Sequence, residues 1–249
     1  ELGTLPSMER MEEAMDRDNS KWRKNNEDII TPKFQYQYDK WIKNGVFLAL
    51  MTRFGFSNTN NRLHYISNQT DTTITDNKWA WETNMIFMLQ NFEKGMSFRI
   101  AYFSSKNIAP LEQKLQLIDN SNPLYITLGN PDLKDMRFHT ISSYYANRWG
   151  KTLFNTSMNM YVTQNAIAMG TVYNRTTGKT TAKPENVNGN WNIDFNSEVD
   201  FPLVKSDKWR LKVKPSYKYI HNVDLNGSKD SYTAEIVKAT RSVVNTHNI

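Results

Sequence analysis

Side chains that could do chemistry are few and scattered in this sequence. The histidines are His64, His139, His221 and His247, and no two of them have the spacing of paired metal ligands. His139 precedes Ser142 and Ser143, but we interpret it as a polar strand residue rather than a hydrolytic base. Cysteine is absent, which excludes disulfides and thiolate chemistry. Hydrolase and phosphate-binding glycine motifs are also missing. The sequence therefore predicts no enzyme, no catalytic residue, no metal and no cofactor.

Composition narrows the class of protein further. The chain has 249 residues, which is room for one large β-domain or two average ones. Its net charge is +6, but lysine and arginine are dispersed without a basic block, so we expect no nucleic-acid partner. No run of 18 apolar residues occurs, which excludes a transmembrane helix. Transmembrane strands are short and alternate, so the low mean hydropathy does not exclude them.

From Pro32 onward, apolar and polar residues alternate with a period of two, which is typical of β-strands with one apolar face. The expected strands are Lys33–Trp41, Val46–Phe56, Trp79–Gln90, Met96–Ser104, Arg137–Asn147, Phe154–Val162, Trp191–Phe201 and Trp209–Tyr219, while Ser231–Asn245 fits a strand or a helix. Residues 1–31 lack the alternation and are predicted to be a loop or a helix. The chain thus divides into segment 1–31 and an all-β, antiparallel domain 32–249 of about nine strands.

Connections between these strands alternate between short and long. The short ones are Lys43–Gly45, Asn91–Gly95, Arg148–Lys151 and Pro202–Lys208, and the long ones are Ser57–Lys78, Ser105–Met136, Thr163–Asn190 and His221–Asp230. Up-and-down transmembrane barrels have short periplasmic turns and long extracellular loops. Tryptophans at strand ends are placed as an aromatic girdle requires, namely Trp41, Trp79, Trp81, Trp149, Trp191 and Trp209. We therefore predict a transmembrane β-barrel, and the odd strand number predicts that it is only part of a larger one.

Two motifs lie within the longest of these connections. Ala109–Leu115 contains Pro-Leu-Glu-Gln-Lys-Leu, and Asp119–Lys134 contains Asn-Pro-Leu followed by Gly-Asn-Pro-Asp-Leu-Lys. In this order they resemble segments of the outer-membrane β-barrel family related to TonB-dependent receptors. Asp135 stands where that family usually has a proline, and Lys114 is inserted before Leu115. The resemblance extends over residues 32–219.

This resemblance implies a bacterial outer-membrane barrel of about 22 strands around an N-terminal plug. It also implies energy-coupled import of a bulky nutrient such as a glycan, a peptide or a metal chelate. The implied partners are outer-membrane lipid, the unidentified ligand, the rest of a larger barrel, a plug domain and TonB. This chain shows no plug and no TonB box, so we expect the coupling machinery to lie outside it.

Candidate ligand contacts are the polar and aromatic residues of the long connection, namely Asn120, Asn122, Tyr125 and Asn130. We interpret Gly129-Asn130-Pro131 mainly as a rigid corner, since glycine and asparagine tolerate left-handed backbone and proline fixes φ. The polar side of the strands predicts an acidic lumen face at Glu82, Asp194, Glu198 and Asp200, and a basic one at Arg99, Arg210, Lys212, Lys214 and Lys218. The alternative function is a soluble all-β module that binds carbohydrate on aromatic platforms.

Overall fold

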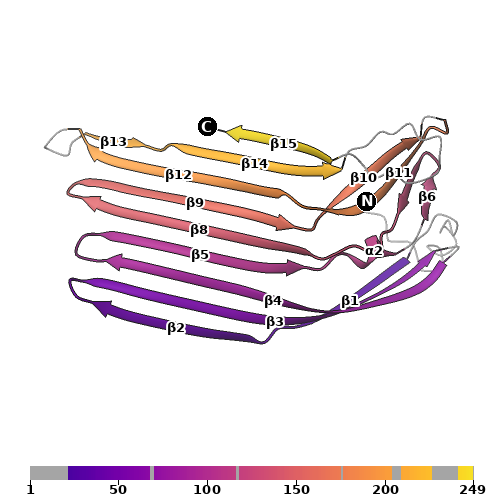
Figure 1. The fold of residues 1–249 in the computed structure, drawn as a ribbon, viewed down its shortest axis with the longest axis horizontal. Helices are drawn as coiled ribbons and strands as arrows, with labels where there is room; N and C mark the ends of the chain where they lie inside the picture. The colour runs from indigo at the N-terminus through magenta and orange to yellow at the C-terminus, as the bar shows by residue number, and fades with distance from the viewer. Residues whose placement is uncertain are drawn as a thin grey trace, which may run out of the picture.

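The computed structural model describes residues 22–67, 70–115, 118–174, 176–203, 209–225 and 241–248. Nearly all of these residues are in β-strands, which form two sheets (Figure 1). The only helix among them, α2 (Leu111–Lys114), has four residues, so no helix in this part of the chain could cross a bilayer. The fold class is therefore all-β, as the alternating sequence predicted.

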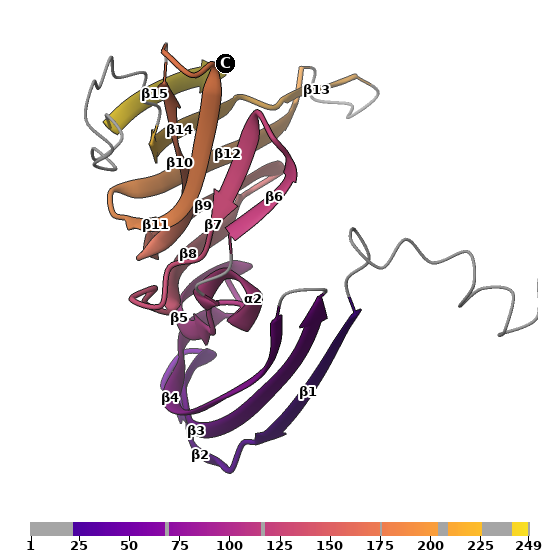
Figure 2. The same cartoon turned by 90° about the vertical axis from the view of Figure 1, so that its right-hand side faces the viewer.

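The main sheet has 11 strands, and all of its pairings are antiparallel. Its strands are β1 (Trp22–Ile30), β2 (Lys33–Ile42), β3 (Val46–Ser67), β4 (Thr70–Asn91), β5 (Met96–Asn107), β8 (Met136–Trp149), β9 (Thr152–Gln164), β12 (Asn190–Pro202), β13 (Arg210–Val213), β14 (Ser216–Leu225) and β15 (Arg241–Asn248). Consecutive strands of this sheet are paired, except that β1 and β2 both pair with β3 and that β13 and β14 both pair with β12. The sheet curves into an open arc that does not close (Figure 2).

A second sheet is built entirely from the long connections. It contains β6 (Ile118–Asn122), β7 (Tyr125–Leu128), β10 (Ala166–Asn174) and β11 (Lys179–Val187), in the order β10-β11-β7-β6. Here β7 pairs in parallel with β11, and the other pairings are antiparallel. This small sheet and α2 lie at one end of the main sheet, and the tight hairpins lie at the other (Figure 1). The predicted placement of short and long connections at opposite ends of the sheet is confirmed, except between β3 and β4, which run on together to Ser67 and Thr70.

The register of the main sheet separates apolar from polar side chains. Directly paired residues share a face, and one row across seven strands is Leu50, Phe87, Ile100, Ser143, Met158, Phe195 and Tyr217. The opposite face of the sheet carries Arg99, Tyr144, Ser157 and Asn196 in another row. We call these the apolar face and the polar face. The alternation along the sequence therefore becomes two chemically distinct surfaces of one sheet.

Three sequence predictions are wrong. Within the predicted segment 1–31, Trp22–Ile30 is strand β1 rather than loop or helix, while residues 1–21 lie outside the described residues. The expected loop Ser57–Lys78 is mostly strand, because β3 and β4 extend together well beyond the predicted ends. The expected strand Trp209–Tyr219 is divided into β13 and β14. Of the ambiguous C-terminal segment, Arg241–Asn248 is strand β15.

Prolines interrupt two strands without changing their register. Both β1 and β2 pair with β3, and between them the Pro32 carbonyl accepts a hydrogen bond of 3.1 Å from the Phe56 N–H. Likewise, between β13 and β14 the Pro215 carbonyl accepts one of 3.0 Å from Ser197 on β12. Proline has no N–H to return the second hydrogen bond of such a pair. Each interrupted pair of segments therefore acts geometrically as a single strand that lacks one donor.

Tight turns end the strands as predicted. Asn44 and Gly45 have φ values of 64° and 66°, the left-handed conformation that the Asn-Gly pair tolerates best. A Cβ atom on Gly45 would lie 2.8 Å from the Glu93 side chain of the next hairpin, so glycine is also needed for space. The connections at the tight-turn end of the sheet are consequently short and closely packed.

Candidate functional site

The apolar face has the dimensions of a membrane-spanning surface. Aromatic residues border it at both ends, with Trp79, Trp81 and Trp191 toward the long connections and Tyr145, Trp149 and Phe154 toward the tight turns. On β12, Trp191 and Phe201 are separated by ten residues, which is about 33 Å of strand. At the usual tilt of about 35–45°, this spans roughly 23–27 Å and matches the apolar band of an outer-membrane barrel. The predicted girdle is thus present, except that the register places Trp41 on the polar face, against Phe47 and Phe92.

On the polar face, charged residues pair with one another instead of forming separate acidic and basic areas. Lys212 Nζ lies 2.9 Å from Glu198 and Arg210 Nε lies 2.8 Å from Asp200. The remaining pairs in this ladder are Lys214–Glu198 at 3.1 Å and Lys218–Asp194 at 3.5 Å. The prediction of one acidic and one basic lumen face is therefore wrong, because strand pairing brings opposite charges from β12, β13 and β14 together. We call the main sheet the wall. Much of the electrostatic field of its polar face cancels over short distances.

At the long-connection end, residues 108–135 and 165–189 form a packed structure that we call the loop layer. Its interior contains the fully or almost fully buried side chains Ala109, Leu133, Ala182 and Pro184. Leu111 and Leu115 of α2 pack against Leu63, which is on the polar face of β3. The helix therefore covers the polar face on the concave side of the arc (Figure 2). The long connections are an ordered layer over the sheet rather than open loops.

The candidate ligand contacts have different environments in this layer. Asn130 is buried, donates a 2.8 Å hydrogen bond to the Pro184 carbonyl and accepts one from the Asp132 N–H, so it braces the corner as its sequence context suggested. Asn122 accepts a 3.0 Å hydrogen bond from the Leu124 N–H within a turn, while Tyr125 is largely exposed beside it. Asn120 lies in β6. Asn122, Tyr125 and Asn130 do not line one common cavity among the described residues.

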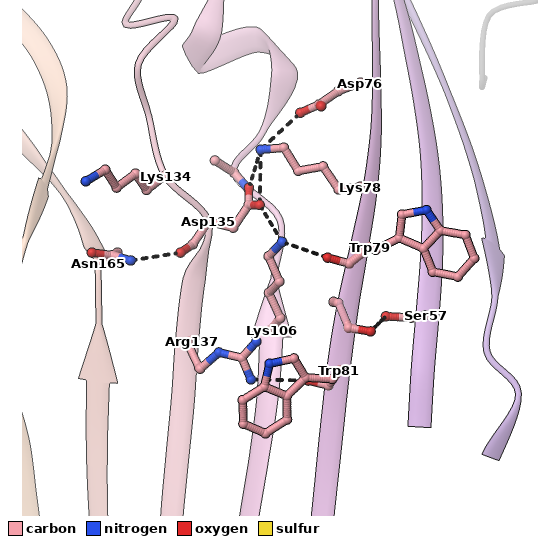
Figure 3. A network of polar contacts seen from close by, with 12 residues as sticks. Ser57, Asp76, Lys78, Trp79, Trp81, Lys106, Lys134, Asp135, Arg137 and Asn165 are labelled. Atoms are coloured by element: carbon pink, nitrogen blue, oxygen red, sulfur yellow. Dashed lines mark hydrogen bonds and ion pairs between the residues drawn. The ribbon is translucent and has the colours of Figure 1, made fainter. Parts of the chain in front are cut away.

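A cluster of five charged residues joins the loop layer to the main sheet, and Asp135 is its centre (Figure 3). Its carboxylate lies 3.0 Å from Lys78 of β4, 2.9 Å from Lys106 of β5 and 3.8 Å from Lys114 of α2. The Ala109 N–H also donates to it at 3.0 Å. The Asp135 side chain is only 5% exposed. Because these contacts come from two strands and the helix, Asp135 fixes all three to one another.

Asp76 completes this cluster from the same strand as Lys78. Its carboxylate accepts a 2.8 Å hydrogen bond from Lys114 and lies 3.3 Å from Lys78. Two carboxylates therefore face three ammonium groups, which leaves one positive charge in excess. The cluster lies beyond Trp79, on the loop-layer side of the aromatic border. These ion pairs consequently add to the apolar packing of Leu111 and Leu115 on Leu63 in joining this part of the layer to the wall.

The cluster shifts the pKa values of its members. Burial alone would raise the pKa of Asp135, but hydrogen bonds from Lys106, the Ala109 N–H and Lys78 outweigh it and hold that pKa below its ordinary 3.8. For Asp76, burial likewise opposes the Lys114 and Lys78 contacts, and the net pKa is again lowered. Burial and the adjacent Lys78 ammonium lower the pKa of Lys114 despite its contact with Asp76. Both aspartates therefore stay ionised at neutral pH.

Acid should loosen the loop layer before it affects the apolar face. Because the native pKa values of Asp76 and Asp135 lie below 3.8, their contribution to stability is complete above that pH and is lost as the pH falls through the native values. Hydrogen exchange of the described residues between 108 and 135, corrected for the intrinsic rate, should therefore accelerate between about pH 4 and pH 2. Strands β8 and β9, whose apolar face does not titrate, provide the internal reference. Equal protection of residues 108–135 across this interval would contradict the role of the two carboxylates.

A groove lies beside this cluster, between the wall and the small sheet. Its volume is about 330 Å³. The main sheet contributes Arg23 and Tyr65, α2 and its C-cap contribute Glu112, Gln113 and Leu115, and the small sheet with its flanking residue contributes Thr127, Leu128, Gly129, Met169 and Pro184. The groove is thus a place where side chains distant in sequence converge. Sequence analysis missed it because its residues come from six separate segments.

The charge cluster was also missed, although the sequence carried one signal for it. Lys114 and Asp135 are the two positions at which the sequence departs from the motifs it resembles, and they lie within ion-pair distance of each other. Compensating departures at two sites indicate contact. His139, in contrast, has a structural partner, since the Tyr102 hydroxyl and His139 Nδ1 are 2.8 Å apart. Among the described residues, no group of histidine and acidic side chains could hold a metal ion.

Comparison with known proteins agrees with the two-faced sheet and its aromatic borders. No curated protein matches the chain. The model of the "Outer membrane protein beta-barrel family" matches residues 85–248, from the middle of β4 to the end of β15. This match covers more than half of the chain and includes the loop layer. The chain therefore belongs to the outer membrane protein beta-barrel family, and its place is the bacterial outer membrane.

Proposed function

We propose that this chain forms part of the wall, and the ligand-capturing entrance, of an energy-coupled importer for a bulky nutrient. The observation that carries the proposal is the loop layer, which packs through α2 onto the polar face at one end of the sheet. In an outer-membrane barrel the polar face lines the lumen. A layer in this position narrows the entrance and presents grooves and polar groups to an arriving solute.

Two further features support import from outside the cell. Long loops of outer-membrane barrels are extracellular, so the loop layer would face the medium and the tight turns the periplasm. The resemblance to barrels related to TonB-dependent receptors supports energy coupling through TonB, with a plug domain as a second partner. The soluble carbohydrate-binding alternative is not supported, because large apolar side chains such as Phe34, Leu50 and Phe54 are exposed along a face that a soluble protein would cover.

Uptake by cells tests this function. Cells that lack the intact protein should lose import of one class among labelled neutral oligosaccharides, acidic oligosaccharides, peptides and metal chelates. Import of that class should also stop when TonB is deleted or the proton-motive force is dissipated. Complementation with the unaltered gene is the control. Import that continues without TonB would identify a passive pore, and unchanged import of every class in the deletion strain would reject the transport function.

A further inference from the structure

The groove between β1, α2 and the small sheet combines features that define a ligand chemistry. Only two of its lining residues, Arg23 and Glu112, are charged, and their side chains pair at 2.7 Å. The groove therefore offers no net charge to a ligand. Side by side, a guanidinium and a carboxylate present hydrogen-bond donors and acceptors together, which suits neighbouring groups that both donate and accept.

One polar group of the groove has unused hydrogen-bonding capacity. The side-chain oxygen of Gln113 is buried and accepts no hydrogen bond from the described residues. A buried acceptor without a donor is unfavourable by about 1–3 kcal/mol, so a turn of the Gln113 side chain toward the groove that let it accept an O–H or N–H from a ligand would be favourable. Thr127 adds a hydroxyl on the opposite side. The polar groups of the groove therefore favour an uncharged ligand that carries hydrogen-bond donors.

Apolar surfaces complete the lining. Tyr65 packs beside Leu111 and Leu115, and Met169 on the facing strand β10 remains 40% exposed. An aromatic ring and a thioether can both cover the C–H face of a sugar ring while polar groups bind its edge. The volume of about 330 Å³ lies at the lower end of the range for small-molecule sites. It therefore fits a short part of a longer ligand.

We propose that this groove binds an uncharged, hydroxyl-rich segment of an oligosaccharide. The proposal rests on the proposed function, since it names the nutrient class that the entrance selects. An extended peptide could not add to the edge of β7, because β7, which provides Thr127 and Leu128, is already paired with β6 and β11. Lys114, next to Gln113 in α2, is held by Asp76, so the charge cluster fixes the helix that lines the groove.

Binding to the purified intact protein in detergent tests the groove separately from transport. The probes are neutral hexasaccharides of glucose, xylose and mannose, an acidic hexagalacturonate and a neutral hexapeptide, each measured by calorimetry. We expect a neutral hexasaccharide to bind, and Gln113→Leu and Thr127→Val each to weaken it about five-fold, as the loss of one hydrogen bond predicts. Both substitutions conserve size, and matching circular dichroism would show that they fold. Tyr173→Ala, which alters an exposed residue of β10 outside the groove, should leave the affinity unchanged.

The outcomes separate this inference from the importer. No binding of any neutral hexasaccharide, tighter binding of the acidic probe or the peptide, or equal affinity in the Gln113 and Thr127 variants would overturn the groove assignment. Binding that depends on Gln113 in detergent, combined with unchanged uptake by deletion cells, would keep the groove and reject import. Oligosaccharide uptake that both variants leave intact would do the reverse.

Discussion

Replacing Asp135 with asparagine should release part of the loop layer from the wall. The substitution keeps the size of the side chain and its acceptor for the Ala109 N–H, but it leaves Lys78 and Lys106 without their shared carboxylate. Removing one member of a buried ion pair typically costs about 3–5 kcal/mol, because the remaining charges stay desolvated. At the lower end of that range, local opening becomes about a hundred times more frequent.

A buried thiol can measure this opening, because the chain contains no cysteine. Leu133→Cys places a reporter at a position that is 3% exposed, two residues from Asp135. In whole cells, a membrane-impermeant maleimide should label this cysteine about a hundred times faster when Asp135→Asn is present. The matched control is Asp71→Asn, whose 2.8 Å pair with His64 is exposed and should change the rate less than about five-fold. Equal labelling rates in the two variants would contradict the role of Asp135 in holding the loop layer to the wall. If the reagent did not label the cysteine from outside the cell, the proposed orientation of the barrel would be wrong.

The second large effect should come from Met158→Arg on β9. Met158 lies in the middle of the apolar face, between Ser143 and Phe195 of the neighbouring strands. Arginine near the bilayer midplane destabilises a barrel by about 2–4 kcal/mol, since its guanidinium must be taken from water into hydrocarbon. We expect this loss in denaturant unfolding of the intact protein in lipid vesicles.

The adjacent residue gives the control for this substitution. Asn159 points to the polar face and is paired with Asp194, so Asn159→Arg places the same charge beside a carboxylate. Its unfolding free energy should stay within about 1 kcal/mol of the unaltered protein. If both arginine variants were equally destabilised, the assignment of the two faces would be wrong.

Much of the fold could be predicted from the sequence, because the bilayer imposes the alternation directly. Leu48, Phe87, Phe98, Phe195 and Leu211 share the apolar face as predicted, while Gln37, Glu82, Arg99, Asp194 and Lys212 share the polar one. Beyond the aromatic border that signal disappears. Polar residues are frequent on both faces of β1 and of the parts of β3 and β4 beyond this border. Hydropathy therefore does not alternate along these segments, although they are strands.

The candidate site was much less accessible to sequence analysis. Local physics was enough for Asn130, since a Gly-Asn-Pro corner constrains its own backbone. The charge cluster and the groove depend on tertiary contacts, such as Asp76 with Lys114 and Tyr65 with Gln113, that no local spacing encodes. Charges predicted to form separate faces likewise cancel through cross-strand pairs. Pairing partners, rather than residue types, determine the chemistry of this protein.

The position of Pro32 has a consequence for cooperativity. It stands opposite Phe56, at the level of Trp81 and hence at the border of the apolar band. The ladder between β3 and its outer neighbour loses one donor at this point, so β1 can fray without breaking any hydrogen bond of β2. We therefore expect β1 and the strands of the apolar band to unfold as separate units. Fluctuations of β1 would then not spread to the part of the wall that contacts lipid.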